Sequence, residues 1–470
     1  MNILSLFQSF VNHFQGFLSD SISFHDLEDK ISYSTNSLNI NTLKDILESI
    51  DLEYKNSDER KAKYYVQSTR ERTLITSLGL LTFNKTYYRS KKKENDKYIF
   101  YSYLEDYLGI DKWAKMTLKA ETNLINNATE NGMSWAARNT IPRYVITRQT
   151  ISTKVKNINY NLDIDIPRVK YIPKILYIEA DEVHANLQRK KKLKGKKKNK
   201  VVPVILTHEG HKEDFIKKKE LLNTHYIASS ILKNDKLWNE TYKYLDKRYD
   251  LERIEYLFIS GDGAPWIKGY MEAFPNAIYV IDKFHYRKAL NYIFKRDSFI
   301  TNLADSYLRN KMIYEFKALV QLQIKLHSNQ RKDMIKNQKY LINNIEGIIN
   351  QHHPMYKCPA SMEGHISNKY ARFITSRPHA YSVDGLENTV QLLTMKANNI
   401  NLTEELYHQF KYGNSSYKEL NLEKYISKFR LQANQFNDID LKYNFAHPVH
   451  NNTFDLKDNY RLDYFLSIRK

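Results

Sequence analysis

The sequence predicts an α/β fold built around a mixed β-sheet. Short apolar runs bounded by turn residues are typical of buried strands, and three of them stand out, Ile175–Ile178, Tyr256–Ile259 and Ala277–Ile281. A strand-like stretch, Val201–Gly210, follows the first run closely enough to pair with it. A helical pattern over Asn234–Tyr249 precedes the second run, and helical crossovers of this kind join parallel strands. We therefore expect antiparallel strands first and helix-linked parallel strands after them.

The composition indicates a folded protein with a polyanionic partner. The chain has 470 residues, 42% of them hydrophobic and 13% aromatic, which is enough for roughly two to four domains. Its formal net charge of +20 favours nucleic acid as the partner. We find no run of roughly 18 apolar residues and no signal-peptide pattern, so we expect no membrane partner and a cytoplasmic, nucleoid-associated location. The single cysteine, Cys358, excludes an internal disulfide and a cysteine-based zinc cluster.

We expect residues 1–104 to form N-terminal helices and a β-hairpin. Apolar residues recur at helical spacing over Ile3–Leu18, which predicts an amphipathic helix. Packing on the rest of the protein is the favoured role for this helix, and dimerisation or membrane contact is the alternative. A polar segment, Ser34–Asn41, separates it from a charged helical stretch at residues 42–70.

The hairpin is expected within Arg70–Lys93. Two β-rich runs flank Gly79 there, and polar and apolar residues alternate along the second run. The lysines at its end, Lys91–Lys93, are candidates either for contact with phosphate or for a solvated tip.

We expect residues 105–165 to be helical. A helix over about Lys112–Ala128, the turn Asn131–Met133 and a short helix capped by Ser134 precede a polar helix at about Thr147–Ile158. This arrangement is typical of a helix-turn-helix DNA-binding domain, and also of plain three-helix bundles. The side chains of the last helix that could face DNA are Arg148, Gln149, Thr153 and Lys154.

Three carboxylates cluster in the first strand of the predicted sheet. Glu179, Asp181 and Glu182 follow its apolar start, and a period of two places Glu179 and Asp181 on one face and Glu182 on the other. Such a concentration of carboxylates is costly unless something neutralises it. A divalent cation would do so.

A strongly basic run, Arg189–Lys200, connects this strand to the next. It holds nine basic residues in twelve and reads as the tip of a hairpin. A charge run of this kind is often only a solvated loop, but its closeness to the carboxylates favours contact with a phosphate backbone. The candidate DNA-binding residues are Arg189, Lys190, Lys191, Lys192, Lys196, Lys197 and Lys198.

The predicted strand order is that of a ribonuclease H-like core. A further strand is expected around Glu213–Leu222, and the first and fourth strands should then lie side by side and bring their acids together. Asp181 belongs to the first strand, Asp262 follows the fourth after a glycine, and Asp282 follows the fifth directly. The carboxyl end of such strands is where ligands and metals bind. The alternative for Asp262 is a plain Asp-Gly turn.

The rest of the chain is assigned around this core. We expect the core to consist of residues 166–285 and 358–400, interrupted by an all-helical insertion at 286–357. Residues 401–470 form a tail to which the sequence assigns no role.

Four further residues are candidates for the site. Glu363, just after the insertion, could supply a third acid, and Glu387 is its rival, although its neighbours suggest an ordinary helix surface. His285 follows Asp282 by three residues and could orient a phosphate or simply bond Asp282. Trp266 could stack on an unpaired base, with packing in the core as the favoured alternative.

Several segments together resemble one protein family. YIEADEVH, GDGAPWI, DKFHYRK, EGHISN and SRPHAYS, in this order between residue 177 and about 390, are similar to the Lre-type group of bacterial insertion-sequence transposases. That group is an uncharacterised protein family, distantly similar to Mutator-like DDE transposases. The resemblance covers most of the chain. It implies metal-binding catalytic acids at Asp181, Asp262 and Glu363, with Asp282 and His285 as a supporting pair.

The resemblance also implies an activity and its partners. Two Mg²⁺ ions, for which Mn²⁺ could substitute, would be held by the three acids during DNA strand cleavage and strand transfer. The partners would be the ends of the insertion sequence and the target DNA, and synapsis of two ends implies a homo-oligomer. Two alternatives remain open, a ribonuclease H-like nuclease or resolvase without strand transfer, and a decayed, non-catalytic DNA-binding copy.

Overall fold

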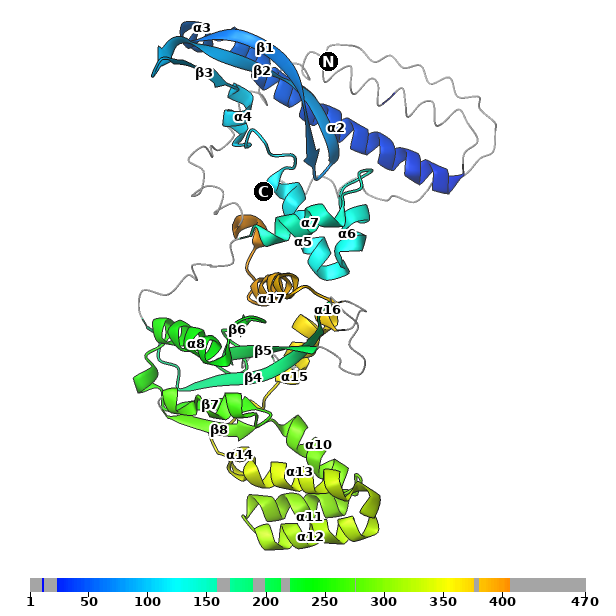
Figure 1. Ribbon diagram of the computed structural model, residues 1–470, viewed down its shortest axis with the longest axis vertical. Coiled ribbons are helices and arrows are strands. Elements are labelled where there is room, and N and C mark those ends of the chain that lie inside the picture. Colours follow the sequence, from blue (N-terminus) through cyan, green and yellow to red (C-terminus); the bar gives the residue numbers. More distant parts are fainter. Residues whose placement is uncertain are drawn as a thin grey trace, which may run out of the picture.

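The computed structural model of the chain describes Val11 and residues 23–158, 170–188, 199–212, 220–274, 276–375 and 380–405. The helix expected at Ile3–Leu18, apart from Val11, and most of the tail lie outside these residues. So do all seven candidates of the basic run, Arg189, Lys190, Lys191, Lys192, Lys196, Lys197 and Lys198. Within the described ranges the protein is a mixed α/β structure with two sheets, extended along one axis (Figure 1). None of the helices in these ranges has the length and apolarity needed to span a bilayer.

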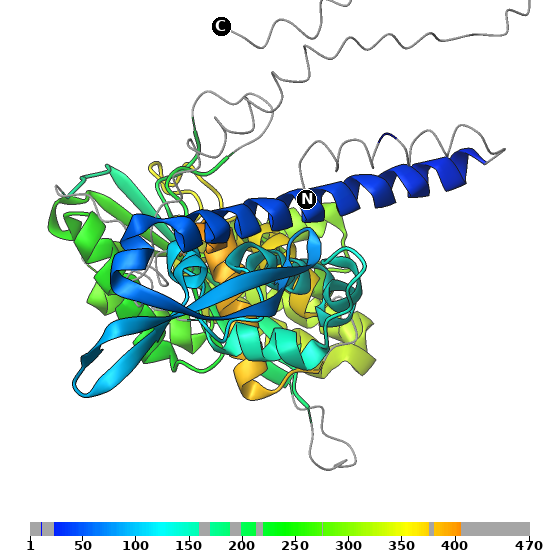
Figure 2. The same cartoon turned by 90° about the horizontal axis from the view of Figure 1, so that it is seen from above.

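The N-terminal region contains the expected hairpin within a three-stranded sheet. Its strands are β1 (Tyr64–Thr76), β2 (Gly79–Glu94) and the unforeseen β3 (Lys97–Tyr101), paired antiparallel in this order. A long helix, α2 (Phe24–Asn56), lies across this sheet (Figure 2). Two short helices, α3 (Asp58–Lys63) and α4 (Tyr103–Leu108), flank the sheet in sequence.

Two expectations for this region are wrong. Ser34–Asn41 is not a separator, because it lies inside α2, where Ile40 packs against the apolar cluster between the helix and the sheet. The helix expected at 42–70 also ends early. Ser57 caps a new helix, and the β-favouring Tyr64 begins the strand β1.

The next layer consists of α5 (Leu118–Asn131), α6 (Met133–Asn139) and α7 (Arg148–Lys156). The three helices are present as expected, with two corrections. The first begins at Leu118 and not near Lys112, because Thr117 caps it and the preceding residues bridge to β1. Ser134 is not the cap of α6, which begins directly after Gly132 at a φ of 87°.

The central sheet has five strands in the order β6–β5–β4–β7–β8, namely His225–Ala228, Asn199–His208, Ile175–Asn186, Tyr256–Gly261 and Ala277–Ile281. β4 pairs antiparallel with β5 and parallel with β7, so the first and fourth strands lie side by side as expected. The third strand is β6, which begins after the expected run Glu213–Leu222. In the described part of that run, Leu221 forms only an isolated bridge to His211.

Helices cover both faces of this sheet. α8 (Asn234–Arg248) and α9 (Pro265–Lys268) lie on one face, with α15 (Met362–Ile366) and α17 (Val383–Ala397) on the other. Ser382 caps α17 as expected. Because side chains alternate along a strand, Leu176 and Ile178 of β4 enter the first apolar core and Tyr177 enters the second.

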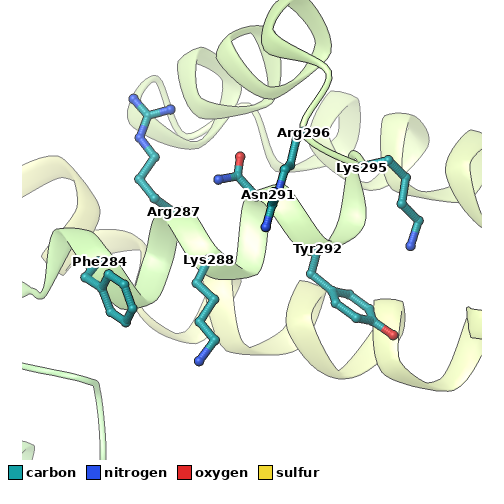
Figure 3. Close-up of a pocket in the computed structure, with 7 residues that line it drawn as sticks. All are labelled: Phe284, Arg287, Lys288, Asn291, Tyr292, Lys295 and Arg296. Carbon is teal, nitrogen blue, oxygen red and sulfur yellow. The ribbon is translucent and has the colours of Figure 1, made fainter.

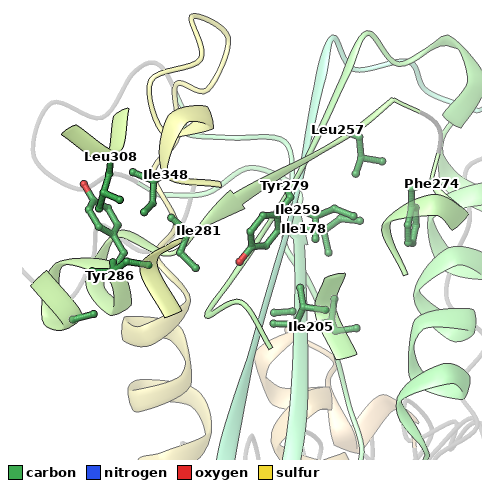
Figure 4. Close-up of a cluster of buried hydrophobic side chains, with 14 of the residues drawn as sticks. Ile178, Ile205, Leu257, Ile259, Phe274, Tyr279, Ile281, Tyr286, Leu308 and Ile348 are labelled. Atoms are coloured by element: carbon green, nitrogen blue, oxygen red, sulfur yellow. The ribbon is translucent and has the colours of Figure 1, made fainter. Parts of the chain in front are cut away.

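The segment expected to be helical after Tyr286 is helical. It follows α10 (Lys283–Ile293) with α11 (Ser298–Arg309), α12 (Ile313–Leu326), α13 (Arg331–Asn343) and α14 (Ile345–Asn350). Figure 4 shows one apolar cluster that runs from Ile259 in the sheet to Leu308 and Ile348 in these helices. The helices are therefore fixed to the sheet by a shared core.

Candidate functional site

Three aspartates follow one another across the central sheet. Ala180 of β4 pairs with Gly261 of β7, and Gly261 pairs with Ile281 of β8, all in parallel. The next residues along the three strands are Asp181, Asp262 and Asp282. Adjacent strands lie about 4.8 Å apart, so this register places the three residues in one row. We call these three residues the aspartate row.

At Gly261, just before Asp262, the backbone of β7 lies very close to that of β4. A Cβ atom there would stand 2.8 Å from the carbonyl oxygen of Ala180 and 2.5 Å from the Cδ1 atom of Ile267. Only glycine fits this position, and it brings the end of β7 close against β4. The strand therefore presents Asp262 directly beside β4.

Asp262 also caps the turn that follows it. Its Oδ1 atom accepts a hydrogen bond from the Ala264 backbone N–H at 2.8 Å, and Gly263 adopts a φ of +90°. The Asp-Gly turn considered from the sequence is therefore present. One carboxylate oxygen serves this turn, and Tyr340 donates to the Asp262 backbone carbonyl at 2.8 Å.

The carboxylate of Asp282 caps the first turn of α10. It accepts hydrogen bonds from the backbone N–H of Phe284 at 3.0 Å and from Nδ1 of His285 at 2.8 Å. This bond and the charges of Asp181 and Asp262 raise the pKa of His285, which favours its charged form. Of the two roles considered for His285, the bond to Asp282 is therefore present, and orientation of a phosphate stays a prediction.

Glu179, two residues before Asp181, is neutralised within the protein. Its carboxylate is 2% exposed and accepts hydrogen bonds from His208 Nε2 at 3.0 Å and from the Ser361 backbone N–H at 2.8 Å. The Gly210 N–H donates to His208 Nδ1, which fixes the tautomer that donates to Glu179. A divalent cation is therefore not needed for Glu179, which corrects the view of the three carboxylates of β4 as one cluster.

Glu182 points to the opposite face of β4, as its spacing predicts. Burial raises its pKa, and the charge of Asp262 adds to this rise. The indole N–H of Trp266 offsets part of it without reaching hydrogen-bond geometry. Trp266 itself is half-buried beside Trp238, whose Nε1 donates to its carbonyl at 2.9 Å. This is the packing role considered from the sequence, and base stacking by Trp266 stays a prediction.

The helix α15 carries Glu363, whose charge acts on Asp181 of the row. Its first turn is tied to β4 by the bond from Ser361 to Glu179, and its last turn by the hydrogen bond between His365 and the hydroxyl of Tyr226 in β6. Glu363, between these two anchors, is exposed and its charge acts on Asp181. Two anchors on a helix of five residues fix the backbone from which Glu363 extends.

Asp181 is the acid of the site whose charged form its surroundings disfavour. Burial raises its pKa to about 6, and the negative charges of Asp262 and Glu363 contribute, while His285 opposes the rise. Asp181 accepts a hydrogen bond only from the adjacent Glu182 N–H among the bonds of the described residues, at 2.8 Å. The structure thus brings Asp181, Asp262, Glu363 and His285 into one electrostatic neighbourhood.

Glu387 lies elsewhere. Its carboxylate accepts hydrogen bonds from the hydroxyls of Ser229 at 2.8 Å and Ser230 at 2.7 Å, and from the backbone N–H of Ser230. Glu387 therefore holds the segment after β6 against α17. This is a structural role that its sequence surroundings did not indicate.

The two candidates on α7 differ in availability. Arg148 is exposed in the first turn of the helix. Lys154 is half-buried and forms an ion pair with Glu121 of α5 at 2.6 Å, so it braces the three-helix layer. Contact of Arg148 and Lys154 with DNA stays a prediction.

The acids fit a divalent cation by type but do not form a preassembled cluster. Among the described residues, no three His, Cys, Asp or Glu side chains converge as metal ligands. Oxygen donors are what Mg²⁺ prefers, and Asp181, Asp262 and Glu363 supply them. The charges of Asp262 and Glu363 both raise the pKa of Asp181 and His285 opposes them, so a cation at Asp181 would relieve this repulsion.

Sequence reasoning missed the residues that position the site. His208, Ser361, Tyr226 and His365 act through contacts between segments far apart in the chain. The available signal was the EGHISN segment, whose His365 lies one helical turn after Ser361, two residues before the segment begins. The partners of these residues on the sheet had no local signal.

These observations define a mixed α/β protein with an acidic site where the parallel pairing of β4, β7 and β8 ends. The chain belongs to UPF0236, an uncharacterised protein family whose model matches residues 17–409. One UPF0236 protein of Caldanaerobacter subterraneus subsp. tengcongensis is 28% identical over 92% of this chain and 91% of its own, and a second is 28% identical over 89% and 87%. The name of the first joins eleven gene designations and that of the second joins four.

Among solved structures, a Drosophila P element transposase strand transfer complex matches 70% of this chain and 89% of its own. The sequence identity is 12% and the TM-score 0.23.

Replacing Asp181 with asparagine is expected to stabilise the protein in the presence of EDTA. The raised pKa means that the folded state disfavours the charged carboxylate, so above about pH 6 Asp181 costs on the order of 2 kcal/mol, and the cost fades as the pH falls toward 4. Urea unfolding at several pH values measures this difference. Asp246→Asn, at an exposed ion pair, is the control and should change little. A D181N protein that is less stable than wild type at about pH 7.5 would contradict the expectation.

Replacing Glu179 with alanine is expected to destabilise the protein, in contrast to Asp181→Asn. It leaves the buried His208 Nε2–H and Ser361 N–H without an acceptor, which costs about 3–5 kcal/mol. Glu179→Gln keeps an oxygen acceptor and should lose less. Both are measured by urea unfolding, and equal stability of the alanine variant and wild type would show that the pair has no anchoring role.

Proposed function

We propose that this protein is a DDE-type transposase, which cleaves DNA at the ends of an insertion sequence and joins the ends to a target. The observation that carries the proposal is the aspartate row, which follows directly where the parallel pairing of β4, β7 and β8 ends, with the charge of Glu363 acting on Asp181. The strand order and directions are those expected of a ribonuclease H-like core, with an added helical layer. The family resemblance of the sequence agrees with this assignment.

Asp181, Asp262 and Glu363 would hold Mg²⁺, with Mn²⁺ as a substitute. A pair of such ions supplies activation of an attacking oxygen and stabilisation of a leaving oxygen on phosphorus. The protein's own part is positional. The paired strands set Asp181 beside Asp262, and the two anchors of α15 hold Glu363.

His285 would contribute positive charge beside the row. Its Nδ1–H is donated to Asp282, and the raised pKa favours the imidazolium form. A cation there would attract the phosphate of a bound strand and offset the repulsion between phosphate and carboxylates. Asp282 acts through His285 and as the cap of α10, which agrees with the supporting role that the resemblance implies.

The names of the relatives support a mobile element. Eleven and four gene designations under single protein names are what several copies of one element in a genome would produce. The formal charge of +20 suits a protein that holds two DNA ends and a target. A homo-oligomer at synapsis and a nucleoid-associated location belong to the same proposal.

Replacing Asp262 with alanine is expected to abolish cleavage and to leave DNA binding within about twofold of wild type. Loss of partners beyond the ligands costs metal sites about 10–100-fold, so loss of a ligand should cost at least about 100-fold. The substrate is DNA that carries the sequences flanking the gene, incubated with Mg²⁺ and target DNA and analysed for nicked and joined products.

The outcomes of this assay separate the alternatives. Nicking without joining by wild-type protein would assign a nuclease or resolvase and overturn strand transfer. Binding without either reaction would indicate a non-catalytic copy. Loss of binding together with cleavage in the Asp262→Ala protein would make Asp262 structural.

Glu363→Gln and Glu387→Gln form a matched pair. Glu363 is exposed, so its replacement should leave stability within about 0.5 kcal/mol and reduce cleavage at least about 100-fold. Glu387→Gln should lose about 1–3 kcal/mol, because its bonds to Ser229 and Ser230 weaken, while the folded fraction keeps its cleavage rate. The reverse pattern would transfer the role of third acid to Glu387.

A further inference from the structure

One face of α10 and the turn after it is basic and aromatic. A cavity of about 670 Å³ is lined, among the described residues, by Phe284, Arg287, Lys288, Asn291, Tyr292, Lys295 and Arg296 (Figure 3). Four of these seven side chains are cationic and none is acidic. We call these seven residues the α10 face. Nothing in the catalytic proposal above makes use of it.

The rings and cations of the α10 face are interleaved. Phe284, Lys288 and Tyr292 are four residues apart and project to one side of the helix (Figure 3). The Lys288 ammonium lies 5.7 Å from the centre of the Phe284 ring, and Lys295 lies 4.8 Å from that of Tyr292. Phe284 is 50% exposed and Tyr292 37%. The two exposed rings and the cations beside them therefore form one mixed aromatic and basic surface.

The cations of this face are not all equally available. Arg287 is shared with Asp305 at 3.3 Å, and Tyr292 donates to Asp333 at 3.3 Å. Lys288 and Arg296 are exposed and form no ion pair with the described residues. They are therefore free to meet an anionic partner.

The α10 face begins next to the aspartate row, because its first residue, Phe284, contacts His285. The Phe284 ring packs edge-on against the His285 ring, with centroids 5.3 Å apart, and His285 lies within the field of Asp181 and Asp262. A ligand on this face would therefore lead directly to the acids. This inference rests on the proposed function for the identity of that ligand as DNA.

We infer that the α10 face binds an unpaired DNA strand beside the site of cleavage. Lys288 and Arg296 meet its phosphates, and Phe284 and Tyr292 stack on its bases. Unpaired bases are required because the faces of paired bases are covered by their neighbours in the duplex, whereas a single strand offers each base to an aromatic ring. Phosphate contacts alone would need no exposed ring.

The test compares binding of single-stranded and duplex DNA of equal length by the full chain at several salt concentrations. Replacing Lys288 and Arg296 together with glutamine should reduce the slope of log affinity against log salt by about 1.4 for the single strand, since each phosphate contact contributes about 0.7. Phe284→Leu should weaken single-strand binding about tenfold and change duplex binding less than twofold.

Matched controls come from α12, which carries exposed residues of the same kinds. Lys317 and Lys325, replaced together with glutamine, remove two exposed cations, and Tyr314→Leu removes a ring that is 87% exposed. These variants should bind both DNA forms as wild type does. Equal effects of the α10 and α12 variants would overturn the inference.

Other results bear on the inference and the catalytic proposal separately. Equal losses for single-stranded and duplex DNA would overturn the assignment of an unpaired strand. Wild-type single-strand affinity in the Lys288/Arg296 variant, in a protein that cleaves DNA, would overturn the inference and leave the transposase proposal intact. Loss of single-strand binding in the Lys288/Arg296 variant, when the wild-type protein never cleaves DNA, would support the inference and overturn the transposase proposal.

Discussion

Parallel pairing of β4, β7 and β8 places Ala180, Gly261 and Ile281 in register, and the residue after each of them is an aspartate. Carboxylates on neighbouring strands repel one another, so this arrangement opposes folding. It persists because the strands beneath are held by apolar cores on both faces, and because a shift by one residue would turn those core side chains outward. The register is thus set by burial, and the repulsion among the acids is a consequence that the rest of the site must accommodate.

The surroundings of each carboxylate determine how that repulsion is relieved. Glu179 is satisfied by His208 and Ser361, and in return it anchors the helix that carries Glu363. Asp282 is satisfied by its own helix. Burial raises the pKa of Asp181, and its few partners offset only part of that rise. An acid with two partners and an acid with only a local backbone bond therefore stand two residues apart on one strand face, distinguished by the groups that the fold brings to them.

Local patterns predicted much of the fold and only part of the site. Four of the five strands of the central sheet, the hairpin, the cap at Ser382 and the pairing of His285 with Asp282 follow from spacing within short segments, whereas the third strand, β6, was expected too early in the chain. The buried pair Glu179–His208 depends on the register of β4 with β5, which no local pattern fixes. The choice between Glu363 and Glu387 likewise depends on what each helix packs against. The length of α2 was missed because its polar stretch is supported by packing on a distant sheet.

The helix α10 links the two halves of the proposed site. Its first turn is fixed to the row by the cap at Asp282 and by His285, so its direction is set by the same register that sets the acids. From Phe284 to Tyr292 the helix rises about 12 Å, so the face is long enough to contact several nucleotides of one strand. Tyr286 and Leu290, on its opposite side, are buried in the core shared with the sheet. A strand bound along α10 would therefore be held by a rigid element, and its phosphates would reach the acids in one fixed position.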